Sequence, residues 1–178
     1  SIGEEQEQHH FYPFFQFLLV GVNGSFLTGD LFNLFVCFEV MLVSSYALVV
    51  LGGTKRQLRE TLKYILINIV SSSLFVATMA YLYAALGTLN MAHLSQRITE
   101  VGQTGILSVI AMMLLTVFSL KAGLFLFYWL PGPYTAPPTA VTAIFAALLT
   151  KVGLYAIIRT FTLIFYQDNG FMYSLIGW

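Results

Sequence analysis

The sequence predicts an all-α, polytopic transmembrane bundle of about five spanning helices, followed by the start of a sixth. Of its 178 residues, 58% are hydrophobic and only 9% are charged, whereas soluble domains carry about 25% charged residues. The apolar runs are long enough for spanning helices, each of which needs about 20 such residues. They also lack the alternation of apolar and polar residues that marks the strands of a membrane barrel. Together these observations exclude a soluble globular fold and a barrel.

Five apolar windows divide the chain. We expect a polar N-terminal segment at residues 1–10, a five-helix transmembrane bundle at 11–165, and a loop with the start of a further transmembrane helix at 166–178. The last run is too short to cross a bilayer and there is no initiator Met, so we expect a segment of a longer polypeptide. The five predicted spans lie near residues 11–28, 31–51, 61–86, 104–130 and 138–165.

The loop after the second window sets the predicted orientation. It reads GGTKRQLRE at residues 52–60, with Lys63 just beyond, and it is the one loop rich in cations. Because such loops stay in the cytoplasm, we place it inside. The loop at 87–103, with Arg97 as its one Lys or Arg, is then outside, and the uncharged junction at 130–138 is inside.

Composition argues against several other classes of protein. Lys plus Arg and Asp plus Glu both number 8, so the chain lacks the basic surface of a nucleic-acid-binding protein. A single cysteine, Cys37, allows no internal disulfide and no Cys-based metal site. No glycine-rich phosphate loop or Ser/His/Asp set occurs. We therefore predict no cofactor and no metal, and we expect the lipid bilayer as one partner.

Setting aside the charges of the loops, we single out three charged residues deep in the predicted spans: Glu39, Lys121 and Lys151. Each costs about 2.5–3.5 kcal/mol at the bilayer centre, and such residues normally face a bundle interior and serve an ion pathway. The plainer interpretation is a structural ion pair that fixes helix packing. A single Glu–Lys pair leaves the second lysine without a counter-charge. We therefore favour a proton relay and expect all three side chains to share one interior.

Polar neighbours fit a hydrated interior. Asn68, Ser71 and Ser72 share one helix face by their i, i+3 and i+4 spacing. Ser and Thr also hold membrane helices together, and the sequence leaves the two uses of the serines open. Further polar residues adjoin the two lysines: Ser119, Thr150 and Tyr155.

Electrostatic magnitudes are compatible with a relay. At about 8 Å and an effective dielectric of about 20, a Glu–Lys pair is worth about 2 kcal/mol. A membrane potential of about 150 mV supplies about 3.5 kcal/mol per charge. Because the two are comparable, making and breaking the pair could gate a lysine against the driving force.

The junction at residues 129–139, WLPGPYTAPPT, contains four of the chain's prolines. We expect a helix boundary or break between Trp129 and Pro138, with Pro138 in the first turn of the next helix. A rigid interhelical turn would explain the prolines. Proline-rich breaks in transport helices can also expose backbone groups to an ion cavity.

Four runs of sequence resemble a known family. They are GVNGSFLTGDLFNLFVCFEVM at 21–41, FSLKAGLF at 118–125, APPTAV at 136–141 and LLTKVGLY at 148–155. Nearly the whole chain resembles the D subunit of Mrp-type multisubunit sodium/proton antiporters. It is related more loosely, through the Glu, Lys and Trp-Leu-Pro pattern, to the antiporter-like membrane subunits of respiratory complex I.

The resemblance implies a fold of about fourteen helices with two inverted five-helix repeats, of which this chain matches the first repeat, helices four to eight, and the beginning of helix nine. It makes Glu39, Lys121 and Lys151 a hydrated proton relay. It implies partners among the other subunits of a membrane antiporter complex, protons and monovalent cations as substrates, and a bacterial inner or plasma membrane. One departure is that the proline usual after the helix-seven lysine is missing from residues 124–129, which puts the usual break there in question.

The sequence is compatible with three functions. The first is a proton-translocating subunit of a cation/proton antiporter. The alternative is a proton-pumping membrane subunit of an NADH:quinone oxidoreductase, and the third is a passive structural subunit. The sequence favours a transporter subunit over an enzyme in its own right, because it lacks a flavin or iron–sulfur ligand set.

Overall fold

The protein is a helical bundle in a computed structural model that describes residues 10–102, 105–167, 170 and 173–174. The expected all-α transmembrane class is confirmed. A 3-10 turn, Phe127–Trp129, precedes α7, and a turn of π-helix, Phe145–Leu149, joins α8 to α9. The α-helices are α2 (Phe11–Leu27), α3 (Leu31–Val50), α4 (Lys55–Leu86), α5 (Met91–Val101), α6 (Gly105–Ala122), α7 (Pro131–Thr135), α8 (Thr139–Ile144) and α9 (Thr150–Leu163).

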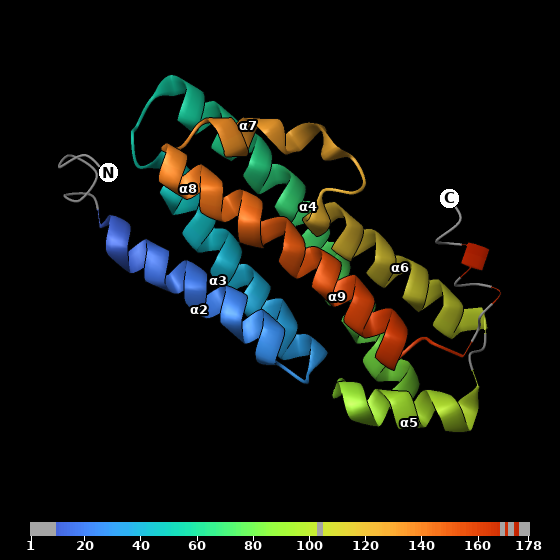
Figure 1. The fold of residues 1–178 in the computed structure, drawn as a ribbon. Coiled ribbons are helices and arrows are strands. Elements are labelled where there is room, and N and C mark those ends of the chain that lie inside the picture. Colours follow the sequence, from blue (N-terminus) through green and yellow to red (C-terminus); the bar gives the residue numbers. More distant parts are fainter. Residues whose placement is uncertain (1–9, 103–104, 168–169, 171–172, 175–178) are drawn as a thin grey trace.

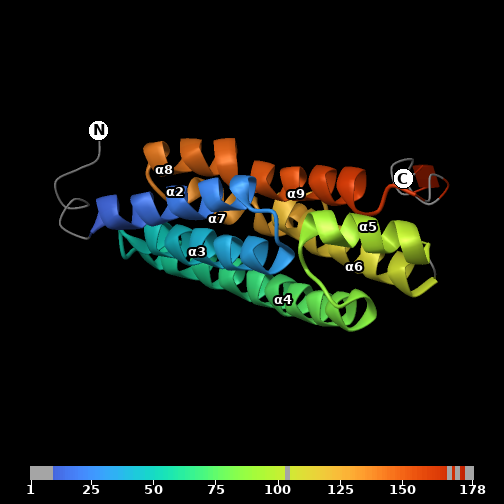
Figure 2. The same cartoon turned by 90° about the horizontal axis from the view of Figure 1, so that it is seen from below.

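The long helices run side by side along one axis (Figures 1 and 2). In packing order, α2 contacts α3, α3 contacts α4, α4 contacts α6, and α6 contacts α9. Among the described residues, four helical segments are long and apolar enough to cross a membrane: Leu31–Val50, Lys55–Leu86, Gly105–Trp129 and Thr139–Leu163. The apolar α2 is shorter, at 17 residues. These five segments correspond to the five expected windows.

The ends of the bundle are defined by helix caps. The Asp30 carboxylate accepts hydrogen bonds from the backbone N–H groups of Phe32 and Asn33 and starts α3. Thr54 and Gln57 form a capping box that starts α4. The helix therefore begins at Lys55, before the expected residue 61, so the cationic segment forms its first turns and is not a free loop. We refer below to the Lys55 end of the bundle, where α4 begins, and to the Asn90 end, where α4 has finished.

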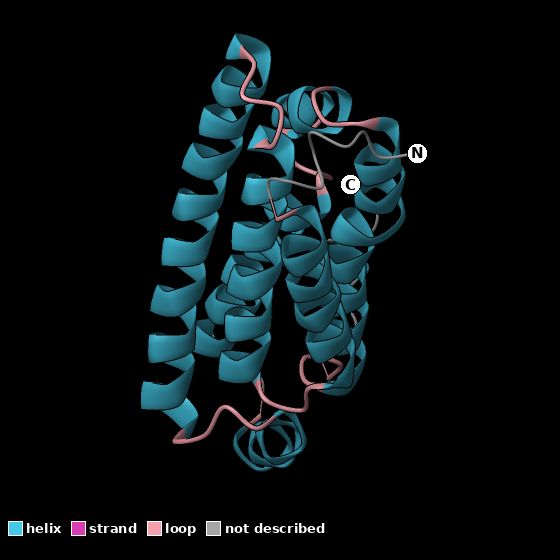
Figure 3. Ribbon diagram, turned by 90° about the vertical axis from the view of Figure 1, so that its left-hand side faces the viewer, coloured by secondary structure: helices cyan, strands magenta, loops and turns pink. Residues whose placement is uncertain are grey.

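An additional helix, α5, lies at the Asn90 end, oblique to the long helices (Figures 1 and 3). The sequence assigned this stretch to a loop. Its apolar side chains Met91, Leu94 and Ile98 are buried on one face. Two backbone hydrogen bonds fix its start, from Leu31 N to Leu89 O at 3.0 Å and from Met91 N to Gly29 O at 2.8 Å.

The helix expected at residues 104–130 is longer than the helix that the structure shows there. In the structure α6 ends at Ala122, because Gly123 takes a φ of 70° and Leu126 a φ of 51°. Glycine adopts such left-handed geometry without steric cost, so the chain breaks here without the missing proline. The expected break between Trp129 and Pro138 is confirmed, since α7 ends at Thr135 and α8 begins at Thr139.

Two expected segments lie largely outside the described residues. The polar N-terminal segment is described only at His10. Of the expected start of a further span, residues 170, 173 and 174 are described beyond the loop. The domain boundaries at residues 10 and 166 therefore stay predictions.

Candidate functional site

Glu39 and Lys121 meet inside the bundle, on facing helices. Glu39 lies midway along α3, and Lys121 lies in the last turn of α6. Lys121 Nζ is 4.0 Å from Glu39 Oε1. At that separation and an effective dielectric of about 20, Coulomb attraction is about 4 kcal/mol. The end of α6 also stabilises the positive charge of Lys121, because the C-terminus of a helix carries partial negative charge.

Ser72 of α4 joins the two charges. Its hydroxyl donates to Glu39 Oε1 at 2.5 Å and accepts from Lys121 Nζ at 3.2 Å. The sequence placed Ser72 on the polar face of its helix without assigning it a partner. Three helices, α3, α4 and α6, thus contribute one residue each to a continuous acid–hydroxyl–ammonium chain.

Burial differs sharply between the two charges. The Lys121 side chain is 2% exposed and the Glu39 side chain 36% exposed. The Lys121 ammonium lies 5.2 Å from the centre of the Phe38 ring, a cation–π distance. The Phe38 ring packs in turn on Phe75 and Phe118. These aromatic rings surround the lysine with apolar surface, so its polar contacts are concentrated on the Ser72 side.

The buried face of α4 changes character along its length. Between the Lys55 end and the Glu39–Lys121 pair, its buried positions are polar, whereas beyond the pair most of them are apolar. The polar members are Gln57, Thr61, Tyr64, Asn68 and Ser71; the later members are Phe75, Thr78, Met79, Leu82 and Leu86. We call the first set the α4 polar stripe. It lies between the Lys55 end of the bundle and the charged pair.

Tyr64 is the centre of the α4 polar stripe. Ser45 Oγ lies 3.1 Å from the Tyr64 hydroxyl, and the Tyr64 ring stacks on Trp129 with centroids 5.3 Å apart. Thr61 Oγ1 and Trp129 Nε1 are buried and have no hydrogen-bond partner among the described residues. Buried polar atoms of this kind are commonly satisfied by ordered water, so this region is chemically suited to hydration.

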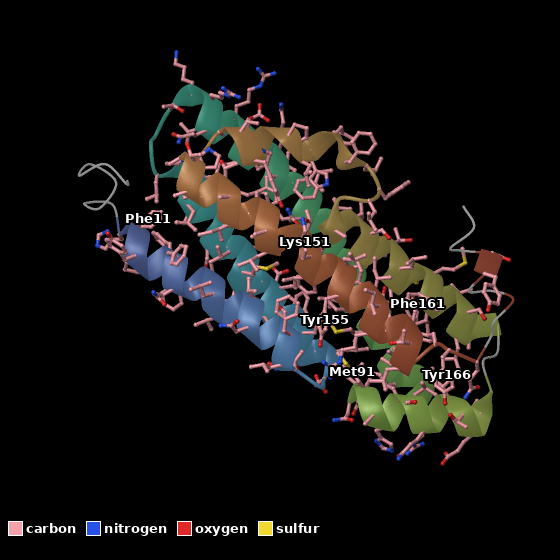
Figure 4. The ribbon with its side chains drawn as sticks, viewed as in Figure 1. Phe11, Met91, Lys151, Tyr155, Phe161 and Tyr166 are labelled. Atoms are coloured by element: carbon pink, nitrogen blue, oxygen red, sulfur yellow. The ribbon has the colours of Figure 1, made fainter. Side chains whose placement is uncertain are left out.

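Lys151 does not join the pair. Its side chain is exposed, and its Nζ donates to Ala146 O at 2.7 Å. That carbonyl belongs to the π-helical turn Phe145–Leu149, a local widening that often occurs at functional sites. Figure 4 shows Lys151 midway along the helix that α8 and α9 form. The expectation of one shared interior is therefore met by Glu39 and Lys121, and not by Lys151.

The backbones that carry the two lysines nevertheless touch. A Cβ built at Gly153 would lie 2.6 Å from the backbone nitrogen of Ala122. These residues stand close to Lys151 and Lys121 in the sequence, so both lysines leave their helices close to the α6–α9 crossing. One side chain turns into the bundle and the other turns out.

Arg159 is a charge within the fifth window that the sequence interpretation overlooked. Its guanidinium donates to the Tyr155 hydroxyl and, from Nη1 at 3.4 Å, to Phe26 O. Tyr155 also donates to Phe26 O, at 2.8 Å. These contacts tie α9 to the C-terminal turn of α2, on the side of Lys151 toward the Asn90 end (Figure 4). A signal was present, since Lys151, Tyr155 and Arg159 are spaced four residues apart.

The chemistry available at the site is proton transfer. A carboxylate, a hydroxyl and an ammonium can exchange protons along hydrogen bonds, and a third titratable group, Lys151, lies on the adjoining helix. Among the described residues no group of three or more His, Cys, Asp or Glu side chains gathers to hold a metal ion.

Comparison with known proteins adds to this picture. The family model for the NADH:quinone oxidoreductase/Mrp antiporter transmembrane region matches residues 28–178. The D subunit of the Na(+)/H(+) antiporter of Alkalihalophilus pseudofirmus is 60% identical over 177 residues, which cover 99% of this chain and 36% of that protein. The chain thus spans about a third of the length of this relative.

Two solved structures share the fold. One chain of the Mrp complex from Dietzia sp. superposes with a TM-score of 0.82 at 33% identity, covering 91% of this chain and 31% of that chain. One chain of the membrane-bound sulfane sulfur reductase, an archaeal respiratory membrane complex, superposes with a TM-score of 0.84 at 36% identity, covering 92% of this chain and 33% of that chain.

Proposed function

This chain belongs to the NADH:quinone oxidoreductase/Mrp antiporter transmembrane family, and we propose that it forms the proton-relaying part of a subunit of a cation/proton antiporter. It is a multi-pass membrane protein, as its family and its four long apolar helices require. We place it in the bacterial cell membrane, together with the other subunits of an Mrp-type complex. The observation that supports this proposal most strongly is the hydrogen-bonded chain from Glu39 through Ser72 to Lys121.

The Glu39–Lys121 pair is the switch of the proposed relay. Its attraction of about 4 kcal/mol is close to the roughly 3.5 kcal/mol that a membrane potential of about 150 mV supplies per charge. Separating or neutralising the pair therefore changes the proton affinity of Lys121 by an amount that the driving force can match. A pair exposed to water would interact too weakly to do this.

The α4 polar stripe supports proton access from the Lys55 end. This end carries the cation-rich turns that the positive-inside rule assigns to the cytoplasm. Toward the Asn90 end the Phe38, Phe75 and Phe118 rings pack beside Lys121. We propose that protons reach the pair along the stripe, and that the rings hinder leakage toward the opposite end.

Lys151 is the proposed next proton-accepting group of the relay after Lys121. Its carbonyl contact at Ala146 leaves the ammonium on an exposed face, from which it can exchange a proton with groups outside this chain. The α6 and α9 backbones touch beside both lysines, and we propose that a water-mediated step passes protons between Lys121 and Lys151 at this crossing.

A second candidate function is the membrane arm of a respiratory complex. The fold match to a chain of an archaeal respiratory membrane complex supports this alternative, at a TM-score of 0.84. The same relay would then be driven by redox chemistry in other subunits. The relative at 60% identity is a D subunit of an Na(+)/H(+) antiporter, and this favours the antiporter.

Replacing Lys121 tests the proposal. Lys121→Gln in the full-length protein within its complex removes the ammonium but keeps a polar side chain. We expect the complex to assemble and cation-dependent proton exchange in everted vesicles to be lost. Lys63→Gln is the matched control, because Lys63 pairs with Glu60 at 2.9 Å on the exposed surface of α4. Native exchange by an assembled Lys121→Gln complex would refute the relay.

A further inference from the structure

We propose that the Ser72 hydroxyl is the proton-carrying group between Lys121 and Glu39. This inference rests on the proposed relay and assigns its central step to one residue. An ion pair in direct hydrogen-bond contact would need no intermediary. Here the two charges are close enough to attract each other and are connected through a third residue.

The distances separate a bridged pair from a direct one. Lys121 Nζ and Glu39 Oε1 are 4.0 Å apart, beyond the range of about 2.7–3.2 Å for an N–H···O hydrogen bond. Ser72 Oγ lies 3.2 Å from the ammonium and 2.5 Å from the same carboxylate oxygen. A serine hydroxyl has one donor and two acceptor positions, so it can accept from lysine and donate to glutamate at once.

The transfer step is balanced without any other reactant. As an N–H bond of Lys121 breaks, its proton bonds to Ser72 Oγ. The original hydroxyl proton leaves Ser72 and bonds to Glu39 Oε1. The products are a neutral lysine, an unchanged serine and a protonated glutamate, and the reverse step restores the ion pair. No net charge leaves the buried site, which makes the step compatible with its apolar surroundings.

Neighbouring polar groups are directed elsewhere. The Ser71 hydroxyl donates to Val117 O at 3.5 Å, and the Asn68 amide donates to Tyr64 O at 2.8 Å. Phe38 covers another side of the ammonium. Within the described part of the chain, Ser72 is thus the residue whose side chain contacts both charges.

Ser72 and Thr78 provide a comparison for the test. Both carry a hydroxyl on α4, but Thr78 lies outside the α4 polar stripe and its hydroxyl donates to Leu74 O at 2.7 Å rather than to the charged pair. We would compare Ser72→Ala, Ser72→Val, Ser72→Thr and Thr78→Val in the full-length protein within its complex. Ala leaves room for a substituting water, Val fills that room with methyl groups, and Thr keeps the hydroxyl.

Proton exchange and its solvent isotope effect are the readouts. A positioned proton-transfer group contributes about 100-fold or more to rate, so we expect Ser72→Val to lower exchange by about 100-fold and Ser72→Ala by less. Ser72→Thr and Thr78→Val should stay near the native rate. In mixtures of H₂O and D₂O the native protein should show a curved dependence, because two protons move together, and this curvature should disappear in Ser72→Val.

Two results would overturn the inference. One is native exchange in assembled Ser72→Val, which would show that protons bypass the hydroxyl. The other is equal loss in Ser72→Thr and Ser72→Val, which would show that side-chain shape matters and the hydroxyl does not. Either result, alongside loss of exchange in Lys121→Gln, would leave the relay standing and remove only the role of Ser72.

Discussion

Gly153 of α9 packs directly on Ala122 of α6. A Cβ at Gly153 would lie 2.6 Å from the Ala122 nitrogen and 2.9 Å from its Cα, closer than side-chain carbons approach backbone atoms. This contact sets the crossing of the two helices that carry Lys151 and Lys121. The geometry of the proposed relay therefore depends on the absence of a side chain at position 153.

Gly153→Ala should destabilise the bundle. The new methyl group meets backbone atoms that cannot rotate away, and overpacking of this kind costs about 1–3 kcal/mol. Thermal unfolding of the detergent-solubilised protein should show a lower Tm. Gly29→Ala is the control, because a Cβ there meets nothing within 4 Å. Equal Tm values for the two variants would argue against a tight α6–α9 crossing.

Lys151→Gln should reduce proton exchange without impairing assembly. Lys151 is exposed and its ammonium donates to the Ala146 carbonyl and the adjacent Thr150 hydroxyl, so its removal breaks little packing. We expect the exchange rate to fall by at least about tenfold. This is a smaller loss than the roughly 100-fold loss expected when a positioned proton-transfer group is removed. Exchange measured in everted vesicles, with Lys63→Gln alongside, checks this. If the two variants match, Lys151 is not a station of the relay.

Arg159→Gln should loosen the junction of α2 and α9. The guanidinium is half-buried and donates to Phe26 O and to Tyr155. Hydrogen bonds of charged groups contribute about 1.5–3 kcal/mol, and partial exposure places the expected loss near 1–2 kcal/mol. Thermal unfolding measures it.

The control for Arg159 is Arg97→Gln. Arg97 lies on the exposed face of α5 and contacts His93 at 3.4 Å. A stability loss as large in Arg97→Gln as in Arg159→Gln would show that the α2–α9 contact has no special role.

Much of the architecture could be predicted from the sequence, because a bilayer leaves few alternatives to long apolar helices. The shared interior of Glu39 and Lys121 could be predicted because a charge facing lipid is costly. The wrong predictions concern helix boundaries, which depend on local hydrogen bonds and backbone angles. The Thr54 capping box extended α4 backward, and the positive φ angles of Gly123 and Leu126 ended α6 early.

The site was only partly predictable. Helical spacing placed Ser72 on the right face of α4, but its position between two charges depends on how three helices pack. The Lys151 ammonium donates to Ala146 O in the π-helical turn Phe145–Leu149, and no residue pattern in the sequence predicts this turn. Arg159 could have been found, since it is a charged residue within an apolar window.

Glu39→Gln in the full-length complex shows whether the charge of Glu39 is the switch of the proposed relay. Gln keeps the size of the side chain and most of its hydrogen bonding but removes the attraction for Lys121, about 4 kcal/mol at an effective dielectric of about 20. Assembly should survive, because the Glu39 side chain is partly exposed, Gln can still accept from the Ser72 hydroxyl, and Lys121 keeps its own contact with Ser72.

The measurement is cation-dependent proton exchange in everted vesicles with assembled complex, compared with Glu39→Asp and with Glu60→Gln. Glu60 is the matched control, since its carboxylate pairs with Lys63 at the Lys55 end of α4. We expect exchange to collapse in Glu39→Gln, to be partly retained in Glu39→Asp and to be native in Glu60→Gln. Native exchange by the assembled Glu39→Gln complex would make Glu39 a packing residue and refute the relay.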